Sequence, residues 1–457
     1  MRKIILILAV LSTLICKAGD SRTAAVVSCQ WDSKNIPDKL YLYNVSNGDM
    51  IEVAASSADA DKTFNFACQV PSADFYFIGL STNPARFFAV YLKPSDRLDL
   101  AVNDSTFVLR GNANSLENQD MEQWNEFIRE AARRANSQTS PISTYVDFFP
   151  LIEEKAQELL HYPTLHSRDG QFNRAFAEYR KLSLTSTALN HLFQLRTVHP
   201  KQEDFTPYYR NMRLEDITKT TDLLHFPHGL ELIGKMIFSR SWIDGTQISS
   251  LESTLNSLPH VLNDTVKGEY VLNMASRQKT YDGMQAFENK YGSYIFTDAQ
   301  KTAFQAMKTD LIKVEEGAPA IDFTVEDTNG KAVKLSDLKG KVVYIDFWAT
   351  WCGPCIKEIP SLKQLESEYH NKNIAFVSIS IDAEKDRPKW KNYVSSHGLQ
   401  GLQWYAPEAA HKEISAAYQI HSIPRFILID KNGKVVMSDA PRPSSSEIRP
   451  LIDRMLN

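Results

Sequence analysis

A short motif constrains the fold of the last third of this chain more than any other feature. The nearly continuous apolar run Val342–Phe347 is typical of a buried central strand, and Cys352-Gly353-Pro354-Cys355 follows it closely. Apolar residues at helical spacing come after the motif, at Ile359, Leu362, Leu365 and Tyr369. The sequence therefore predicts a strand that turns directly into a helix, with two cysteines at the start of the helix.

The segments around this unit alternate between strands and helices. A hairpin is expected ahead of the motif, at 321–325 and 332–335, with a turn at Asn329-Gly330 between its strands. Further strands are expected at 374–381 and 423–430, and helices at 388–396 and 411–418. Such alternation predicts an α/β domain over residues 314–457, with a mainly parallel sheet covered on both faces.

The first residues read as a targeting segment rather than as part of the fold. Two basic residues precede the apolar run Ile4–Ile15, and the small residue Ala18 offers a cleavage point. The run is too short to span a bilayer, which needs about 20 residues. We therefore predict a signal peptide over residues 1–18 and an exported, periplasmic protein. Cys16 is a candidate lipid anchor, although bulky residues precede it where a lipoprotein signal has small ones.

The remaining residues divide by pattern. A chain of 457 residues suggests about three domains. Residues 19–111 hold short aromatic or β-branched runs separated by turn formers, which predicts a small all-β domain, a sandwich or a barrel. Residues 112–313 carry apolar positions at helical spacing, which predicts a helical domain. A Gly- and Pro-containing stretch, Glu315–Ala320, suits the entrance to the α/β domain.

Charge and histidine spacing argue against two classes of partner. The formal net charge is −4 and the chain has no basic block, so we expect no nucleic-acid partner. Histidines are scattered through the helical region without HExxH or comparable ligand spacing, so we expect no metal and no cofactor. They are His161, His166, His191, His199, His225 and His228.

The two motif cysteines carry redox chemistry if the predicted helix begins between them. A sulfur at a helix N-terminus lies among unpaired N–H groups at the positive end of the dipole, which favours a thiolate. We expect Cys352 to attack a disulfide, and Cys355, one turn further in, to resolve the mixed disulfide. Pro354 is tolerated in a first helical turn. A zinc half-site and a structural disulfide are the alternatives, but no second ligand pair follows.

Residues 347–355, Phe-Trp-Ala-Thr-Trp-Cys-Gly-Pro-Cys, resemble the thioredoxin active-site signature. The preceding hairpin and the extra helix after Ile381 are similar to the periplasmic TlpA and ResA branch of that superfamily. The order of the N-terminal strands resembles the β domain often fused to periplasmic thioredoxin-like proteins of the Bacteroidetes type. The branch reduces specific periplasmic proteins, including apocytochromes, so a role in cytochrome c biogenesis is one implication.

The resemblance also implies roles for individual residues. Pro424 stands where thioredoxin folds hold a cis-proline that faces the cysteines, and Ile423 before it would present its backbone to a substrate. Trp351 would be exposed. The implied substrate surface is therefore Trp351, Gly353, Pro354, Ile423 and Pro424.

Two acids are implied as proton acceptors for Cys355. Asp346 matches the buried acid beneath the thioredoxin active site, and Glu358 matches an acid of the ResA-like branch. Glu358 could equally be a solvated glutamate stabilised by the helix dipole. Thioredoxins carry a lysine on the neighbouring strand, whereas Phe376–Ile381 contains none, so the choice between the two acids stays open.

Two further cysteines, Cys29 and Cys68, lie in strand-like runs. A structural disulfide or two buried thiols would fit, and export favours the disulfide.

We expect an exported thiol–disulfide oxidoreductase that reduces protein disulfides and draws electrons from a membrane donor. A disulfide oxidase or isomerase is the alternative in direction. A partner-binding module in residues 19–313 with an accessory redox domain is the alternative in kind. Peroxidase activity is disfavoured, because peroxiredoxins need Thr or Ser three residues before the reactive cysteine, and Ala349 stands there.

Overall fold

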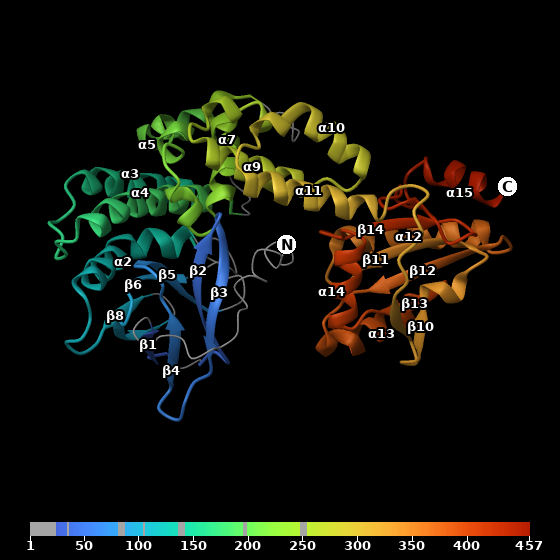
Figure 1. Cartoon of the computed structure of the whole chain (residues 1–457), viewed down its shortest axis with the longest axis horizontal. Coiled ribbons are helices and arrows are strands. Elements are labelled where there is room, and N and C mark those ends of the chain that lie inside the picture. Colours follow the sequence, from blue (N-terminus) through green and yellow to red (C-terminus); the bar gives the residue numbers. More distant parts are fainter. Residues whose placement is uncertain are drawn as a thin grey trace. The chain divides into compact units, whose positions relative to one another are not determined.

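The computed structural model describes residues 24–33, 36–80, 87–103, 106–135, 142–194, 199–246 and 254–457. The predicted signal peptide, with Cys16 in it, lies outside these residues. The chain divides at residues 270 and 271 into two compact units, shown in Figure 1. The first unit holds the strands predicted near the N-terminus and the helices that follow them, and the second holds the cysteine motif.

The first unit contains two four-stranded sheets, with strand orders β4-β1-β7-β8 and β3-β2-β5-β6. Phe88 and Phe107, one from each sheet, meet with ring centroids 6.1 Å apart. Asn47 and Gly48 join β2 to β3, and both have positive φ, as a tight hairpin turn requires. The predicted all-β N-terminal region is confirmed. Its strands are β1 (Ala24–Trp31), β2 (Leu40–Ser46), β3 (Asp49–Ser56), β4 (Thr63–Gln69), β5 (Asp74–Gly79), β6 (Phe87–Leu92), β7 (Arg97–Val102) and β8 (Phe107–Leu109).

The predicted disulfide between Cys29 and Cys68 is wrong, because both are buried free thiols. On the paired strands β1 and β4, Cys29 lies opposite Phe64 and Cys68 opposite Ala25. The two cysteines are therefore four residues out of register, or about 13 Å along the strands. A disulfide needs Cα atoms within about 7 Å of each other. Burial raises the pKa of both thiols, which keeps them protonated and unreactive.

The helices that follow belong to the same compact unit as the sheets. Tyr179 of α4 stacks on Phe75 of β5 with centroids 4.9 Å apart, and Phe172 meets Tyr91 of β6 at 4.8 Å. The predicted boundary at 111 and 112 thus does not separate two compact units. These helices are α2 (Leu116–Ala135), α3 (Tyr145–Leu160), α4 (Gly170–Leu192), α5 (Pro207–Asn211), α6 (Leu214–Ile217) and α7 (Gly229–Asp244). Helix α9 (Asp264–Ala275) spans the division between the two units.

Apolar residues recur at helical spacing over residues 215–239, but the structure has no continuous helix there. Helix α6 ends at Ile217, and α7 begins only at Gly229. Pro227 lies between them and has no N–H to donate, and His228 adopts a left-handed conformation with φ of 55°. The intervening residues still bury Leu223 and Leu224, so the apolar spacing came from core packing rather than from a continuous helix.

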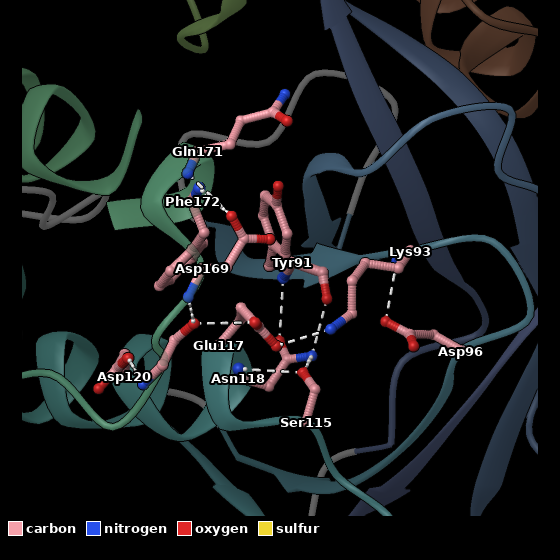
Figure 2. Close-up of polar contacts among 11 residues, drawn as sticks. Tyr91, Lys93, Asp96, Ser115, Glu117, Asn118, Asp120, Asp169, Gln171 and Phe172 are labelled. Carbon is pink, nitrogen blue, oxygen red and sulfur yellow. Dashed lines mark hydrogen bonds and ion pairs between the residues drawn. The ribbon is translucent and has the colours of Figure 1, made fainter. Parts of the chain in front are cut away.

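A side chain of α2 binds the outer edge of β6, as Figure 2 shows. The Tyr91 N–H donates to Asn118 Oδ1 at 2.9 Å, and Asn118 Nδ2 donates to the Tyr91 carbonyl at 2.7 Å. The strand order leaves β6 at an edge of its sheet. The amide of Asn118 therefore satisfies the backbone of Tyr91 as a neighbouring strand would.

Charged groups extend this contact to the start of α4 (Figure 2). Glu117 accepts from Lys93 Nζ at 2.9 Å and from Ser167 Oγ at 2.8 Å. The Ser167 N–H donates to Asp120 Oδ2 at 2.9 Å, and Asp169 caps α4 by accepting from two N–H groups of its first turn. The network ties α2, α4 and β6 together, and its charged groups are paired as buried charges require.

The second unit is built on a seven-stranded sheet with order β10-β9-β13-β12-β11-β14-β15. Central β11 pairs parallel with β12 and antiparallel with β14. Two helices precede the sheet, α10 (Tyr281–Tyr291) and α11 (Asp298–Ile312). The sheet and its helices comprise β9 (Thr324–Asp327), β10 (Ala332–Lys334), β11 (Val342–Trp348), α12 (Gly353–Tyr369), β12 (Ile374–Ser380), α13 (Arg387–Ser396), β13 (Leu402–Tyr405), α14 (Glu408–Ala417), β14 (Arg425–Ile429), β15 (Val435–Met437) and α15 (Ile448–Leu456).

Both faces of this sheet are covered, which explains why every residue of β11 is buried. Ile345 and its same-face neighbours pack into a core that includes Ile414 of α14. Tyr344, on the other face, packs with Leu365 of α12 and Ile452 of α15. The predicted helical middle and C-terminal α/β domain are confirmed.

Candidate active site

The cysteine motif lies where β11 leaves the sheet and α12 begins. Cys352 is the N-cap residue of α12, and its Sγ accepts a hydrogen bond from the Cys355 N–H at 3.2 Å. Pro354 lies in the first turn of the helix, where its missing N–H leaves no intrahelical bond unmade. The predicted placement of a sulfur at the N-terminus of a helix is therefore observed. That environment stabilises the thiolate when the pair is reduced.

In this structure the two cysteines form a disulfide, with Cα atoms 5.2 Å apart. Each is only 4% exposed, so the oxidised pair does not show the expected contrast between an open Cys352 and a shielded Cys355. The bond lies in an apolar cluster with Trp348, Trp390 and Tyr405. The oxidised sulfurs are therefore largely shielded from solvent.

The residues assigned to the substrate surface surround the disulfide. Trp351 is 62% exposed, and Gly353 and Pro354 are exposed beside it. Ile423 packs against the cluster that holds the cysteines, and the Ile423–Pro424 peptide bond is cis. The fold thus brings together two segments that are about 70 residues apart in the sequence, as an α/β sheet does with its strand ends.

The loop before the cysteines is held by an acid that the sequence analysis missed. The buried Asp382 accepts from the Thr350 N–H at 3.0 Å and from Thr350 Oγ1 at 2.8 Å. It also accepts from Ser380 Oγ at 2.8 Å. Its position directly after a predicted buried strand was the available signal, because polar residues at such strand ends often shape a site.

Asp346 is buried in β11, on the face that α12 covers, and hydrogen-bonds to Ser378 of β12. Burial raises its pKa to about 7, and the nearby carboxylate of Glu366 contributes to the rise. Ser378 stands on the strand where thioredoxins carry the lysine, so no cation from β12 offsets this effect. An acid with such a pKa can accept and release a proton near neutral pH.

Glu358, the other predicted proton acceptor, is turned toward the segment that precedes α15. It accepts from the Ser444 N–H at 3.1 Å and from Ser444 Oγ at 3.0 Å, and Arg442 Nη1 lies 3.8 Å away. These partners hold it as a link between α12 and that segment. Asp346 is therefore the better placed of the two acids to take up a proton beneath the motif.

Glu366 of α12 is a third acid that the sequence analysis did not single out. It is 6% exposed, and burial raises its pKa to about 7. It lies on the helix stripe that also buries Leu362, Leu365 and Tyr369. An acid inside an apolar stripe was the signal that could have identified it.

The described residues contain no group of three or more His, Cys, Asp or Glu side chains able to hold a metal ion. Within the same residues, no helix is both long and apolar enough to cross a membrane.

Comparison with known proteins agrees with this geometry. A family model described as Redoxin matches residues 313–450. The thiol-disulfide oxidoreductase ResA of Bacillus anthracis is 39% identical over 137 residues, which cover 30% of this chain and 75% of that protein. ResA of Bacillus subtilis is 33% identical over 135 residues, 30% of this chain and 73% of that protein. The crystal structure of a putative thiol-disulfide oxidoreductase from Bacteroides vulgatus is 43% identical over 32% of this chain and 99% of its own, with a TM-score of 0.29.

A covered α/β sheet with a cysteine pair at the start of a helix defines a thioredoxin-fold redox protein. Given the extent of its identity to the curated relatives, this chain belongs to the TlpA/ResA-like thiol-disulfide oxidoreductases of the thioredoxin superfamily, and it is an oxidoreductase. These likenesses cover about a third of the chain, so the Bacteroidetes-type origin of the N-terminal β domain stays a prediction.

Proposed function

We propose that the protein is an exported reductase of protein disulfides. The Cys352 thiolate attacks one sulfur of a substrate disulfide, whose bond breaks as the leaving thiolate takes up a proton. Cys355 then loses its proton and attacks Cys352, which releases the second substrate thiol and leaves the Cys352–Cys355 disulfide. Two electrons pass to the substrate, and a membrane electron donor restores the dithiol.

The direction rests on the Gly353-Pro354 pair between the cysteines. The same dipeptide occurs in reducing thioredoxins, whose potential is about −270 mV, against about −120 mV for the oxidant DsbA. The exposed Trp351 and the half-buried Ile423 and Pro424 offer an open surface of the kind an extended protein segment can bind. The dipeptide favours reduction, and the open surface favours protein substrates over small oxidants.

The N-terminal segment accounts for export in this proposal. The segment over residues 1–18 would direct the chain to the periplasm, either free after cleavage behind Ala18 or anchored by lipid at Cys16. Mass spectrometry of the purified protein separates these outcomes, because the cleaved form begins at Gly19 and an anchored form carries the mass of lipid.

Equilibrium titration in defined thiol/disulfide buffers tests the direction. Free thiols are trapped with an alkylating mass tag, and the fraction of oxidised Cys352–Cys355 pair is read at each poise. A potential near the thioredoxin value supports a reductase. A potential near the DsbA value would overturn the reductive direction and make the protein an oxidase or isomerase.

Substrate trapping distinguishes this proposal from the alternative function, in which residues 19–313 form a partner-binding module with an accessory redox domain. Cys355→Ser should hold substrates on Cys352 as mixed disulfides that release on reduction. A double Cys352→Ser, Cys355→Ser variant is the control. Partners that bind the double variant as well as they bind Cys355→Ser would favour the module. Consumption of hydrogen peroxide would revive the disfavoured peroxidase, for which the buried Ala349 supplies no hydroxyl.

A further inference from the structure

A small cavity lies beneath the active site, between β11, β12, α12 and the segment that leads into β13. Its volume is about 10 Å³, close to the least space that holds one water molecule. Its wall includes Asp346 and Trp348 from β11, Glu366 from α12, Ser378 from β12, and Gln403. Two residues with carboxyl groups, from different elements, thus line one small space.

Three polar atoms of the cavity-lining residues lack protein partners. Glu366 Oε2, Gln403 Oε1 and Trp348 Nε1 are buried, and none has a hydrogen-bond partner within the part of the chain that the structure describes. A buried polar atom without a partner costs about 1–3 kcal/mol. The residues that carry these three atoms all line this one cavity, and an internal water is the usual means by which proteins satisfy such atoms.

The residues of the cavity wall extend from the apolar cluster around the cysteines to the surface. Trp348 lines it and also packs in the cluster around Cys352 and Cys355. At the other end, the exposed Lys363 and Gln400 belong to its wall. The wall therefore offers two carboxyl groups, Asp346 and Glu366, between the cysteine cluster and the solvent.

The charges around this cavity set how protons distribute over its carboxyl groups. Asp346 and Glu366 each have a pKa raised to about 7 by burial, and the Glu366 charge raises that of Asp346 further. Lys363 opposes the rise at Glu366, and the hydrogen bond from Ser378 opposes it at Asp346. Tyr344, on the same face of β11, has a pKa well above its usual value, so it stays neutral. Ionisation of Glu366 makes ionisation of Asp346 harder, so the titration of Asp346 is coupled to the charge of Glu366.

We propose that Glu366 is a positioning residue that shares a proton with Asp346 across this cavity and relays it between the buried cysteine and the solvent. When Cys355 resolves a mixed disulfide, its thiol proton passes to the Asp346 carboxylate. Asp346 then hands that proton on to Glu366, which releases it toward the exposed Lys363 end. No electrons move in the relay, so the inference holds whether the enzyme reduces or oxidises its substrates.

The test is the pH dependence of disulfide formation between Cys352 and Cys355 in the full chain. The reduced protein is mixed rapidly with a disulfide-bonded model peptide between pH 5 and 9, and the release of the second peptide thiol is followed. Glu366→Gln removes the charge that raises the pKa of Asp346, so the inflection should move to lower pH by about one unit. Glu366→Asp should keep the inflection near that of the wild type.

Two matched variants separate a relay from a structural role. Glu368 lies on the same helix but pairs with Arg449 at the surface. The pH profile of Glu368→Gln should therefore match that of the wild type. Asp346→Asn should abolish the inflection, and adding Glu366→Gln should then change nothing further, because Glu366 acts through Asp346. An unmoved profile in Glu366→Gln, or an equal shift in the Asp346→Asn background, would overturn the proposal.

A measurement on the wild type covers the case in which Glu366→Gln does not fold. The side-chain carboxyl carbons of Asp346 and Glu366 are titrated by NMR. A shared proton predicts that each carbon shifts in two steps, with both steps at common pH values. A single independent step at each carbon would contradict the relay.

Discussion

Asp346 illustrates how one buried residue links catalysis to stability. Its pKa in the folded protein is about 7, against about 3.9 in an unfolded chain. The folded state therefore binds the proton more tightly than the unfolded state does. The stability that this group contributes is fully present below about pH 4 and is lost as pH rises toward 7.

Asp346→Asn should therefore stabilise the protein at high pH and leave it nearly unchanged at low pH. The gain should grow between about pH 4 and 7 and level off above, at up to about 4 kcal/mol. Urea unfolding of the oxidised protein at pH 4, 6 and 8 measures it. A gain that is equal at all three values would show that charge burial is not its cause.

The site residues divide by how visible they are in sequence. Asp346 is predictable because an acid interrupts an apolar strand, and the cysteines because their spacing carries a mechanism. Glu366 and Asp382 could not be assigned, since an acid on a helix or after a strand is ordinary until the fold shows what encloses it. Glu358 was assigned by resemblance, but its partners lie in a segment 86 residues further along the chain, which no local pattern reveals.

At the scale of elements, strand register decides the state of Cys29 and Cys68. Because β1 and β4 place the two thiols four residues out of register, we expect both to stay reduced. Alkylation of the oxidised, processed, denatured chain should label two cysteines without reductant and four after reduction. Zero labelled cysteines before reduction would show that the two are paired. Native protein should resist labelling at both, since burial raises their pKa values.

The contact between Asn118 and β6 predicts that substitution of Asn118 destabilises the first unit, an effect that helix propensity alone does not predict. Asn118→Ala leaves the N–H and the carbonyl of Tyr91 without their partner at a buried edge. The free energy of unfolding of the first unit should fall by about 2–4 kcal/mol. Glu126→Ala, on the exposed face of the same helix, should change it by less than about 0.5 kcal/mol. Equal losses in the two variants, by chemical denaturation, would argue against the contact.

Elements with strong periodicity were predictable, and elements defined by tertiary contacts were not. The strand at 342–348 and helix α12 follow from local pattern. Strand β13 is only four residues long and draws its pairing from β12 and β9, so a short run could not identify it. Between α6 and α7 the opposite error arises: buried apolar residues recur at helical spacing, although a proline interrupts the helix there.

At the scale of the whole molecule, two units with separate cores should unfold in two steps. The Cys352–Cys355 crosslink belongs to the second unit. Reduction should therefore lower one melting transition by roughly a few degrees and leave the other in place. Differential scanning calorimetry of the oxidised and reduced full chain measures this. A single transition that moves as a whole would contradict the independence of the two cores.

The amide of Asn118 has a consequence for how the molecule behaves in a crowded solution. An uncovered outermost strand is a template on which a second chain can add its own strand, and such additions propagate into aggregates. Asn118 bonds to both backbone groups of Tyr91 on β6, so these groups are not available to pair with a strand of a second chain. The side chain of Asn118 thus favours solubility as well as folding, because it hinders the addition of strands from other copies of the chain at this position.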